Sequence, residues 1–338
     1  MDMFGRHSIL KLFCLLLGLF FVAPIQAETY QCKDESGTPR FQDHPCDGAV
    51  AQPANQTSAS SQTHSTTASG KHFLWQASAG NGTLYLLGSI HFGTSDMYPL
   101  PMVITSSFKQ SDALVVEADI LSADPVELAQ MVSTKAMYQD GSTLHQYLSA
   151  ETLARLQQVS VSLGIPVEML DMQKPWFVSM SLTALALNKL GFSEDMGIDA
   201  HFLSLAKGKK KVIELEGMAW QLALFDQLTT EEQVMMLEET LREIEHGKEF
   251  FDKMLRYWRA GDGEGVQELF DEGVMSSKDS GRLNQIIMID RNRSMTDKLH
   301  ALAQQGGKYF VVVGAGHLPG DQGIVALLKQ RGYRIEQL

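Results

Sequence analysis

The chain has 338 residues, 44% of them hydrophobic, which is long enough to form at least one domain with its own apolar core. Its 40 acidic and 28 basic residues give a formal net charge of −12 at pH 7. Such an acidic chain repels nucleic acids and anionic lipid surfaces, so neither is expected as a partner.

Residues 1–27 have the composition of a cleavable export signal. Basic residues precede an apolar run at 12–22, and Ala-Pro-Ile-Gln-Ala at 23–27 is typical of a signal-peptidase site. The run is too short and too close to the chain start for a typical membrane span, with an uncleaved anchor as the alternative. Cleavage would give a periplasmic or secreted protein beginning at Glu28. No later stretch approaches about 18 consecutive apolar residues, so no stable membrane span is expected after cleavage.

Residues 28–46 are expected to form a small module with two short strands joined by a glycine turn. Cys32 and Cys46 remain after signal cleavage, and an even pair in an oxidising compartment predicts a disulfide. A two-cysteine metal site with His44 is the alternative. The Tyr-x-Cys start and aromatic-x-Asp-x-Pro ending resemble a small exported module of unknown function. Residues 47–70 are rich in Ser, Thr, Ala and Gln without periodicity, which predicts a disordered linker.

Residues 71–338 alternate apolar β runs with helical patterns, which indicates a helix-rich α/β domain around a central sheet. The expected strands are short, at 83–87, 113–117, 211–216, 309–313 and 333–335. Apolar spacing of about 3.6 residues predicts helices at 102–110, 125–133, 149–163, 175–190, 197–207, 218–228, 230–260, 282–305 and 322–331.

Two of the β runs lead into the same motif, Gly88-x-x-His91 and Gly314-x-x-His317. Other β runs end at Glu117 and Glu216. Ligands of open α/β sheets lie beyond the carboxyl ends of the strands, so the four side chains are expected to converge there. The glycines suit a chain that turns with positive φ or that lies close to another segment. The motif is short enough to occur by chance, and its position after a β run is what gives it weight.

A family resemblance covers about residues 73 to 338. "LLGSIHFGTSDMYPLP", "VVEAD", "GID", "LEGMAWQLALFDQL", "DRN" and "VVVGAGHLPG" stand here in the order and wording of the TraB/GumN family, which includes the animal Tiki proteases. The resemblance implies a metal-dependent, peptidase-like site. It also implies a more distant relationship to the erythromycin-esterase and ChaN-like folds.

By this resemblance the metal ligands are His91, Glu117 and His317. Two neutral imidazoles and one carboxylate leave coordination positions open for water, and a bound divalent cation brings the pKa of that water towards neutrality. These ligands suit Zn²⁺, Mn²⁺, Co²⁺ or Fe²⁺, and the residues do not select among the four.

Three further residues at family positions are expected to assist the reaction. Glu216, in preference to Glu117, is expected to accept the proton of the attacking water and pass it to the leaving amine. Arg291 is expected to stabilise the developing oxyanion or to orient a substrate carboxylate. Asp199 is expected either to orient a histidine or to cap its own helix.

The sequence therefore predicts an exported metallohydrolase that acts on a peptide or another small substrate with an amide bond. The alternative is a non-catalytic envelope factor that binds a peptide, pheromone or glycan in the same cleft. The basic turn Lys-Gly-Lys-Lys-Lys at 207–211 could attract anions but is expected to be a solvated loop.

Overall fold

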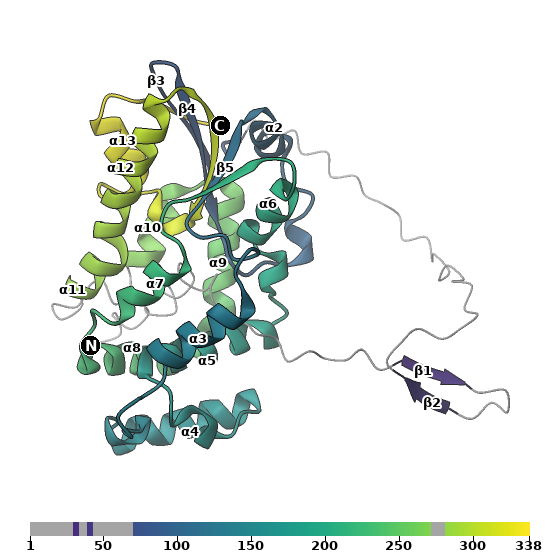
Figure 1. Ribbon diagram of the computed structural model, residues 1–338, viewed down its shortest axis with the longest axis vertical. Coiled ribbons are helices and arrows are strands. Elements are labelled where there is room, and N and C mark those ends of the chain that lie inside the picture. Colours follow the sequence, from purple (N-terminus) through teal and green to yellow (C-terminus); the bar gives the residue numbers. More distant parts are fainter. Residues whose placement is uncertain (1–29, 34–38, 43–69, 272–280) are drawn as a thin grey trace, which may run out of the picture. The chain divides into compact units, whose positions relative to one another are not determined.

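The computed structural model describes residues 30–33, 39–42, 70–271 and 281–338, in two separate compact units (Figure 1). In the smaller unit, β1 (Tyr30–Lys33) pairs antiparallel with β2 (Pro39–Gln42), which agrees with the two strands expected around a glycine turn. The signal segment, Cys46 and most of the linker lie outside the described residues. Export, the disulfide and the disordered linker therefore stay predictions.

The larger unit is built on a mixed sheet of six strands in the order β6-β5-β7-β4-β3-β8. The four strands from β6 to β4 run parallel, whereas β3 is antiparallel to both of its neighbours. The α/β prediction is thus confirmed. The strands are β3 (Leu74–Ala79), β4 (Gly82–Ser89), β5 (Ala113–Val116), β6 (Lys211–Glu214), β7 (Gly307–Gly314) and β8 (Arg334–Gln337).

Strand β3 was not among the predicted strands, and its composition explains why. Its sequence, Leu-Trp-Gln-Ala-Ser-Ala, is short and holds no β-branched residue. It forms because the tight turn at Gly80-Asn81 folds it back onto β4, which is buried along nearly its whole length. A strand of weak propensity is held here by its neighbours.

Helices cover both faces of the sheet. On one face α2 (Met102–Gln110) and α6 (Ile198–Ala206) pack against the central strands. On the other face α12 (Asp290–Gln304) packs against β4 and β7, and α13 (Ile324–Gln330) packs against β3 and β8 (Figure 1). The other helices are α3 (Pro125–Lys135), α4 (Ala150–Leu163), α5 (Pro175–Lys189), α7 (Met218–Phe225), α8 (Thr230–Glu243), α9 (Gly247–Ala260), α10 (Gly263–Asp271) and α11 (Gly281–Asn284).

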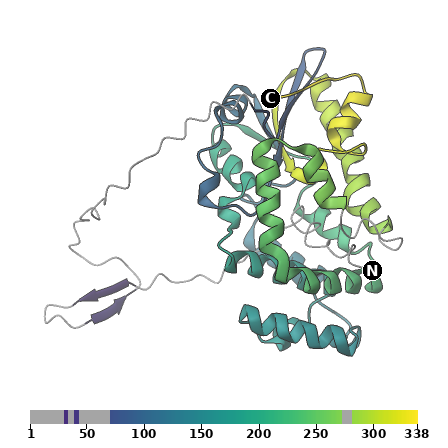
Figure 2. The same ribbon diagram turned by 180° about the vertical axis from the view of Figure 1, so that it is seen from behind.

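The prediction of one long helix at 230–260 is wrong in one respect, because this segment forms two helices. A 3₁₀ turn at Ile244–His246 and the buried Gly247 separate α8 from α9. Helix α8 packs on α5, while α9 packs on α10, and Figure 2 shows the two helices running in different directions. The expected helix at 282–305 is likewise interrupted, by a π-helical segment at Gln285–Ile289.

The helical layer holds a second, smaller core beyond the sheet. It joins α4 and the 3₁₀ turn Val167–Leu170 to α5 and α8, through Leu144, Leu156, Val159, Leu170, Val178, Leu182, Leu237 and Leu241. No helix within the described ranges is both long enough and apolar enough to cross a bilayer.

Candidate functional site

The first Gly-x-x-His motif places His91 at the carboxyl end of β4, where it is buried. Gly88 lies within the strand and does not have positive φ, so close approach is the one of the two expected alternatives that applies. Its role is close approach: a Cβ on Gly88 would lie 2.4 Å from the Phe73 ring, and Trp258 Nε1 donates to the Gly88 carbonyl at 2.7 Å. A side chain here would push the strand end away from its neighbours.

His91 is oriented by a carboxylate. Its Nδ1 lies 2.7 Å from Asp199 Oδ2, and both residues are buried. Burial alone raises the pKa of Asp199, but the charge and hydrogen bond of His91 outweigh it and hold that pKa below its usual range. An ionised carboxylate only accepts hydrogen bonds, so His91 Nδ1 carries a proton and Nε2 faces away from Asp199. Gly197 permits this contact, because a Cβ there would lie 2.2 Å from the His91 carbonyl oxygen.

The second motif holds His317 by an amide in place of a carboxylate. After β7, a 3₁₀ turn at Ala315–His317 carries the imidazole into the interior, where it is fully buried. Its Nδ1 lies 2.6 Å from Asn292 Oδ1, while Asn292 Nδ2 donates to the Gln322 carbonyl at 2.9 Å and so fixes the amide. Burial, aided by the charges of Arg291 and His91, puts the pKa of His317 well below its ordinary value. The ring is therefore neutral, with its lone pair on Nε2.

Glu117 follows β5, which pairs with β7, the strand that leads into the second motif. Its Oε1 accepts from the Gly314 amide at 2.7 Å, and its Oε2 accepts from Arg291 Nη2 at 2.5 Å and Gln221 Nε2 at 3.0 Å. Burial raises the pKa of Glu117, and repulsion from Glu216 adds to this effect against the opposing charge of Arg291. Oε2 is saturated by its two donors, whereas Oε1 keeps one lone pair without a donor.

Arg291 joins Glu117 to Glu216 in a buried ion-pair network. Arg291 Nε and Nη2 donate to the two oxygens of Glu216 at 2.9 and 2.8 Å, and Gln221 Nε2 reaches the same carboxylate at 2.8 Å. The side chains of Arg291 and Glu216 have no exposed surface. Arg291 Nη1 contacts the Ile287 carbonyl at 3.4 Å, inside the π-helical segment.

This network changes the roles expected for two residues. A guanidinium that is enclosed by two carboxylates is not placed to meet a substrate oxyanion, and the carboxylate of Glu216 is already occupied by Arg291 and Gln221. The structure instead favours a positioning role for both residues, in which Glu216 fixes Arg291 and Arg291 holds Oε2 of Glu117. The charge of Arg291 also opposes protonation of Glu117.

A metal ion fits this arrangement at two donors that lie close together. His317 Nε2 is buried without a hydrogen-bond partner among the described residues, and it lies 3.8 Å from Glu117 Oε1. That separation is less than the sum of two metal–ligand bonds of about 2.1 Å, so one ion can touch both atoms. Both imidazoles donate Nδ1–H to an oxygen, as metal-ligating histidines do. Across residues 70–271 and 281–338, no three His, Cys, Asp or Glu side chains are already gathered at metal-ligand distances.

The structure adds Glu194, which the sequence patterns did not single out. It lies in the 3₁₀ turn Glu194–Met196 directly before Gly197, and its Oε1 is buried without a hydrogen-bond partner in the described part of the chain. Burial raises the pKa of Glu194 to about 7, against the favourable charge of nearby His91. The signal available in the sequence was its position three residues before the Gly-x-Asp element.

A cleft of about 440 Å³ opens beside this network, at the carboxyl ends of β5 and β6. Glu216 and Gly217 form part of its wall, and Met218 and Trp220 supply apolar surface. Four other acidic residues line it, namely Asp119, Asp124, Glu127 and Glu214. The cleft is therefore acidic, with apolar surface on one part of its wall.

Comparison with known proteins supports the family indicated by these motifs. Residues 73–337 match the TraB/PrgY/gumN family, and residues 15–69 match a domain of unknown function, DUF4124. The chain is 32% identical over 265 residues to the "Uncharacterized protein YbaP" of Escherichia coli K12, covering 77% of this chain and 94% of that protein. An "Uncharacterized protein" of Treponema pallidum is 21% identical over 275 residues, covering 77% and 81% of the two chains. No solved structure matches. The chain thus belongs to the TraB/PrgY/gumN family.

Proposed function

We propose that the protein is an exported, metal-dependent hydrolase of peptide or amide bonds, with His91, Glu117 and His317 as its metal ligands. The observation that carries this proposal is the buried Nε2 of His317, which has no hydrogen-bond partner in the described part of the chain and lies 3.8 Å from Glu117 Oε1. A buried polar atom without a partner is costly, so its persistence is best explained by a ligand. When bound, a divalent ion would supply a water of lowered pKa.

Asp199 and Asn292 set the protonation of the two imidazoles. Each accepts a hydrogen bond from Nδ1, at 2.7 Å for His91 and 2.6 Å for His317, so on both neutral rings Nε2 is the nitrogen that carries the lone pair. Arg291 and Gln221 hold Glu117 Oε2 and leave Oε1 facing His317. The chain's own residues therefore prearrange the donors.

Glu194 is the group that we propose for proton transfer. Its Oε1 is buried without a partner in the described part of the chain, and its carboxyl lies within electrostatic reach of His91. A carboxyl with a pKa of about 7 can accept a proton from water and return it to a leaving amine at neutral pH. Glu216, the residue expected for this task, is occupied by Arg291 and Gln221.

Two features support the proposed export and the proposed fold relationship. The signal-like segment at 1–27 and the paired cysteines favour action outside the cytoplasm. The parallel strands with helices on both faces and donors at their carboxyl ends favour a distant relationship to the erythromycin-esterase and ChaN-like folds.

Metal content tests the ligand assignment without relying on activity. We expect the purified wild type to bind a divalent ion and to melt at a higher temperature with it, while His91→Ala and His317→Ala lose both properties. His145→Ala is the matched control, because His145 also contacts an aspartate, at 2.8 Å from Asp171, but lies at the surface. Wild type that holds no more metal than the two variants and shows no thermal shift would contradict the proposal.

Cleavage of a peptide library tests the reaction. We expect metal-dependent cleavage by the wild type, none by Glu117→Gln, and a loss of about 10²- to 10⁴-fold in kcat for Glu194→Gln with metal binding retained. Metal binding without cleavage of any peptide would favour the non-catalytic alternative. Unchanged kcat in Glu194→Gln would remove Glu194 from the mechanism.

A further inference from the structure

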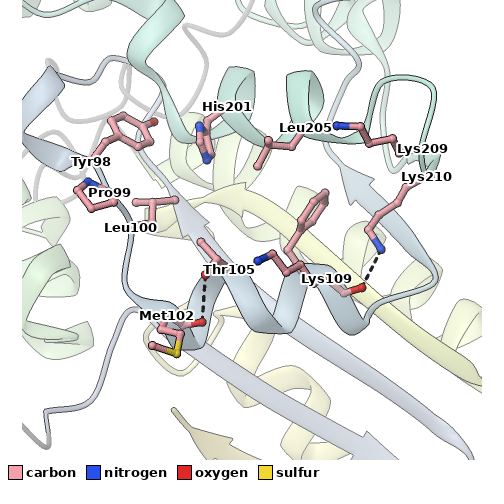
Figure 3. Close-up of a pocket in the computed structure, with 11 residues that line it drawn as sticks. Tyr98, Pro99, Leu100, Met102, Thr105, Lys109, His201, Leu205, Lys209 and Lys210 are labelled. Carbon is pink, nitrogen blue, oxygen red and sulfur yellow. Dashed lines mark hydrogen bonds between the residues drawn. The ribbon is translucent and has the colours of Figure 1, made fainter.

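A second cavity, which neither His91 nor His317 lines, lies between α2 and α6 (Figure 3). Its volume is about 800 Å³, within the range of small-molecule sites. It shares no residue with the network of Glu117, Glu216 and Arg291. The lining residues are Tyr98, Pro99, Leu100, Met102, Thr105, Phe108, Lys109, His201, Leu205, Lys209 and Lys210.

The walls of this cavity are largely apolar. The buried Leu100 and Phe108 and the partly exposed Leu205 provide hydrocarbon surface. Tyr98 and His201 pack ring to ring at 4.8 Å, and the Tyr98 hydroxyl is fixed by donating to the Met196 carbonyl at 2.9 Å. Apolar surface arranged in this way favours an alkyl or aryl group as occupant.

The charges in the cavity are all positive. Three lysines line it and no acidic residue does, although the chain as a whole carries −12. Lys210 is already used, because its Nζ donates to the carbonyls of Ser111 and Lys109 and lies 5.1 Å from the Phe108 ring centroid. Lys109 and Lys209 are exposed, and within the described residues neither ammonium group makes an ion pair or a hydrogen bond.

Lys109 and Lys209 extend along the groove from its two opposite walls, as Figure 3 shows. Lys109 is in the last turn of α2, and Lys209 is in the basic turn that follows α6. Two ammonium groups on the walls of an apolar groove complement a ligand with an anionic head and a hydrocarbon body. An inorganic anion would leave the apolar walls in water, and a neutral lipid would leave both lysines unpaired.

We propose that the cavity between α2 and α6 binds a single-chain anionic amphiphile, with Lys109 and Lys209 on its head group and Leu100, Phe108 and Leu205 along its chain. The head group is a carboxylate or a phosphate monoester, since lysine binds either as a point charge. This site is independent of the proposed hydrolase chemistry. It also gives the turn at 207–211 a role beyond that of a solvated loop.

Isothermal titration of the full chain tests this proposal, with dodecanoate and dodecyl phosphate each kept below its critical micelle concentration. We expect one site for at least one of these probes, and the one that binds more tightly identifies the head group. Butyrate and inorganic phosphate supply heads without a long chain, and dodecyl maltoside supplies the chain without a charge. All three are expected to bind at least about tenfold more weakly.

Variants separate the cavity from general surface charge. Lys109→Gln with Lys209→Gln is expected to weaken binding by about tenfold or more and to reduce its salt dependence. Lys207→Gln is the matched control, because Lys207 is exposed in the same turn but does not line the cavity. Leu205→Gln should weaken binding because it removes an apolar contact with the hydrocarbon chain of the ligand. All the changed residues are at least partly exposed, so melting curves should show folded variants.

Four results would overturn the proposal. These are no binding of either anionic probe, equal binding of dodecyl maltoside, equal binding of inorganic phosphate, and an unchanged affinity in the double lysine variant.

Discussion

At the scale of single residues, the two motif histidines are held by partners of different charge. Asp199 is ionised and favours a proton on His91, whereas Asn292 is neutral and accepts only the Nδ1–H of His317. His317 is also fully buried beside Arg291, which makes a second proton on its ring unfavourable. The two imidazoles therefore lie in different electrostatic surroundings, although the same four-residue motif delivers both.

We expect His317 to make the protein less stable as the pH falls. Folding lowers the pKa of His317. Below about pH 6.5 the unfolded chain takes up a proton at this residue that the folded chain does not. The contribution of His317 to the free energy of unfolding is therefore present above that pH and is lost below it. One such group lowers the free energy of unfolding by up to about 1.4 kcal/mol for each pH unit. The free energy of unfolding of His317→Gln should therefore fall less than that of wild type between pH 7 and pH 5.

Urea unfolding in the presence of EDTA measures this difference without a contribution from metal binding. Parallel pH profiles for wild type and variant would show that His317 accepts a proton in the folded state.

The sequence motifs named the candidate residues but not the contacts that these residues make. The motifs pointed to six residues, but not to the enclosure of Arg291 by Glu117 and Glu216. That enclosure depends on tertiary packing, because α12 lies against β4 and β7 and carries Arg291 to the residues that follow β5 and β6. Glu194 could not be chosen from sequence, because an acidic residue in a polar turn is ordinary. Only its burial beside His91 makes it unusual.

At the scale of elements, β4 is the strand that carries the first histidine, and Gly88 sets its distance from the segments around it. Phe73 packs over this position and Trp258, from α9, donates to the Gly88 carbonyl. The strand end is thus tied to a helix far away in sequence. Sequence patterns predicted the strand and its glycine, but not how closely Phe73 and Trp258 approach that glycine.

We expect Gly88→Ala to destabilise the domain by about 1–3 kcal/mol, because its methyl group would lie 2.4 Å from the Phe73 ring and 3.0 Å from the Ala315 Cα. Gly263→Ala is the control, since a Cβ there meets nothing closer than 3.5 Å. Chemical denaturation compares the two variants. Equal effects would show that crowding at Gly88 is relieved at little cost.

Apolar periodicity located most helices but not the break between α8 and α9. Both helices carry an apolar face that continues the same spacing, so the pattern passes through Gly247 without interruption. The chain changes direction because the two faces pack on different partners, α5 and α10. That information lies in the tertiary structure and not in the segment itself.

At the scale of the whole molecule, the larger unit completes its sheet with its own residues. Strand β3 begins at Leu74, and every neighbour in the six-stranded sheet comes from the same unit. We expect a fragment of residues 70–338 to unfold at the same urea concentration as the chain that begins at Glu28. A lower midpoint for the fragment would show that the preceding residues stabilise the domain.

The pairing of β3 with β8 brings the two ends of this unit together. The His72 amide donates to the Leu338 carbonyl, and the Leu338 amide donates to the Leu74 carbonyl. Hydrogen bonds of an antiparallel pair run across the strands. A force that pulls residues 72 and 338 apart therefore acts along these bonds and meets them one after another. Under tension the sheet should open like a zipper from this corner, with the histidine-bearing strands β4 and β7 protected until β3 and β8 have separated.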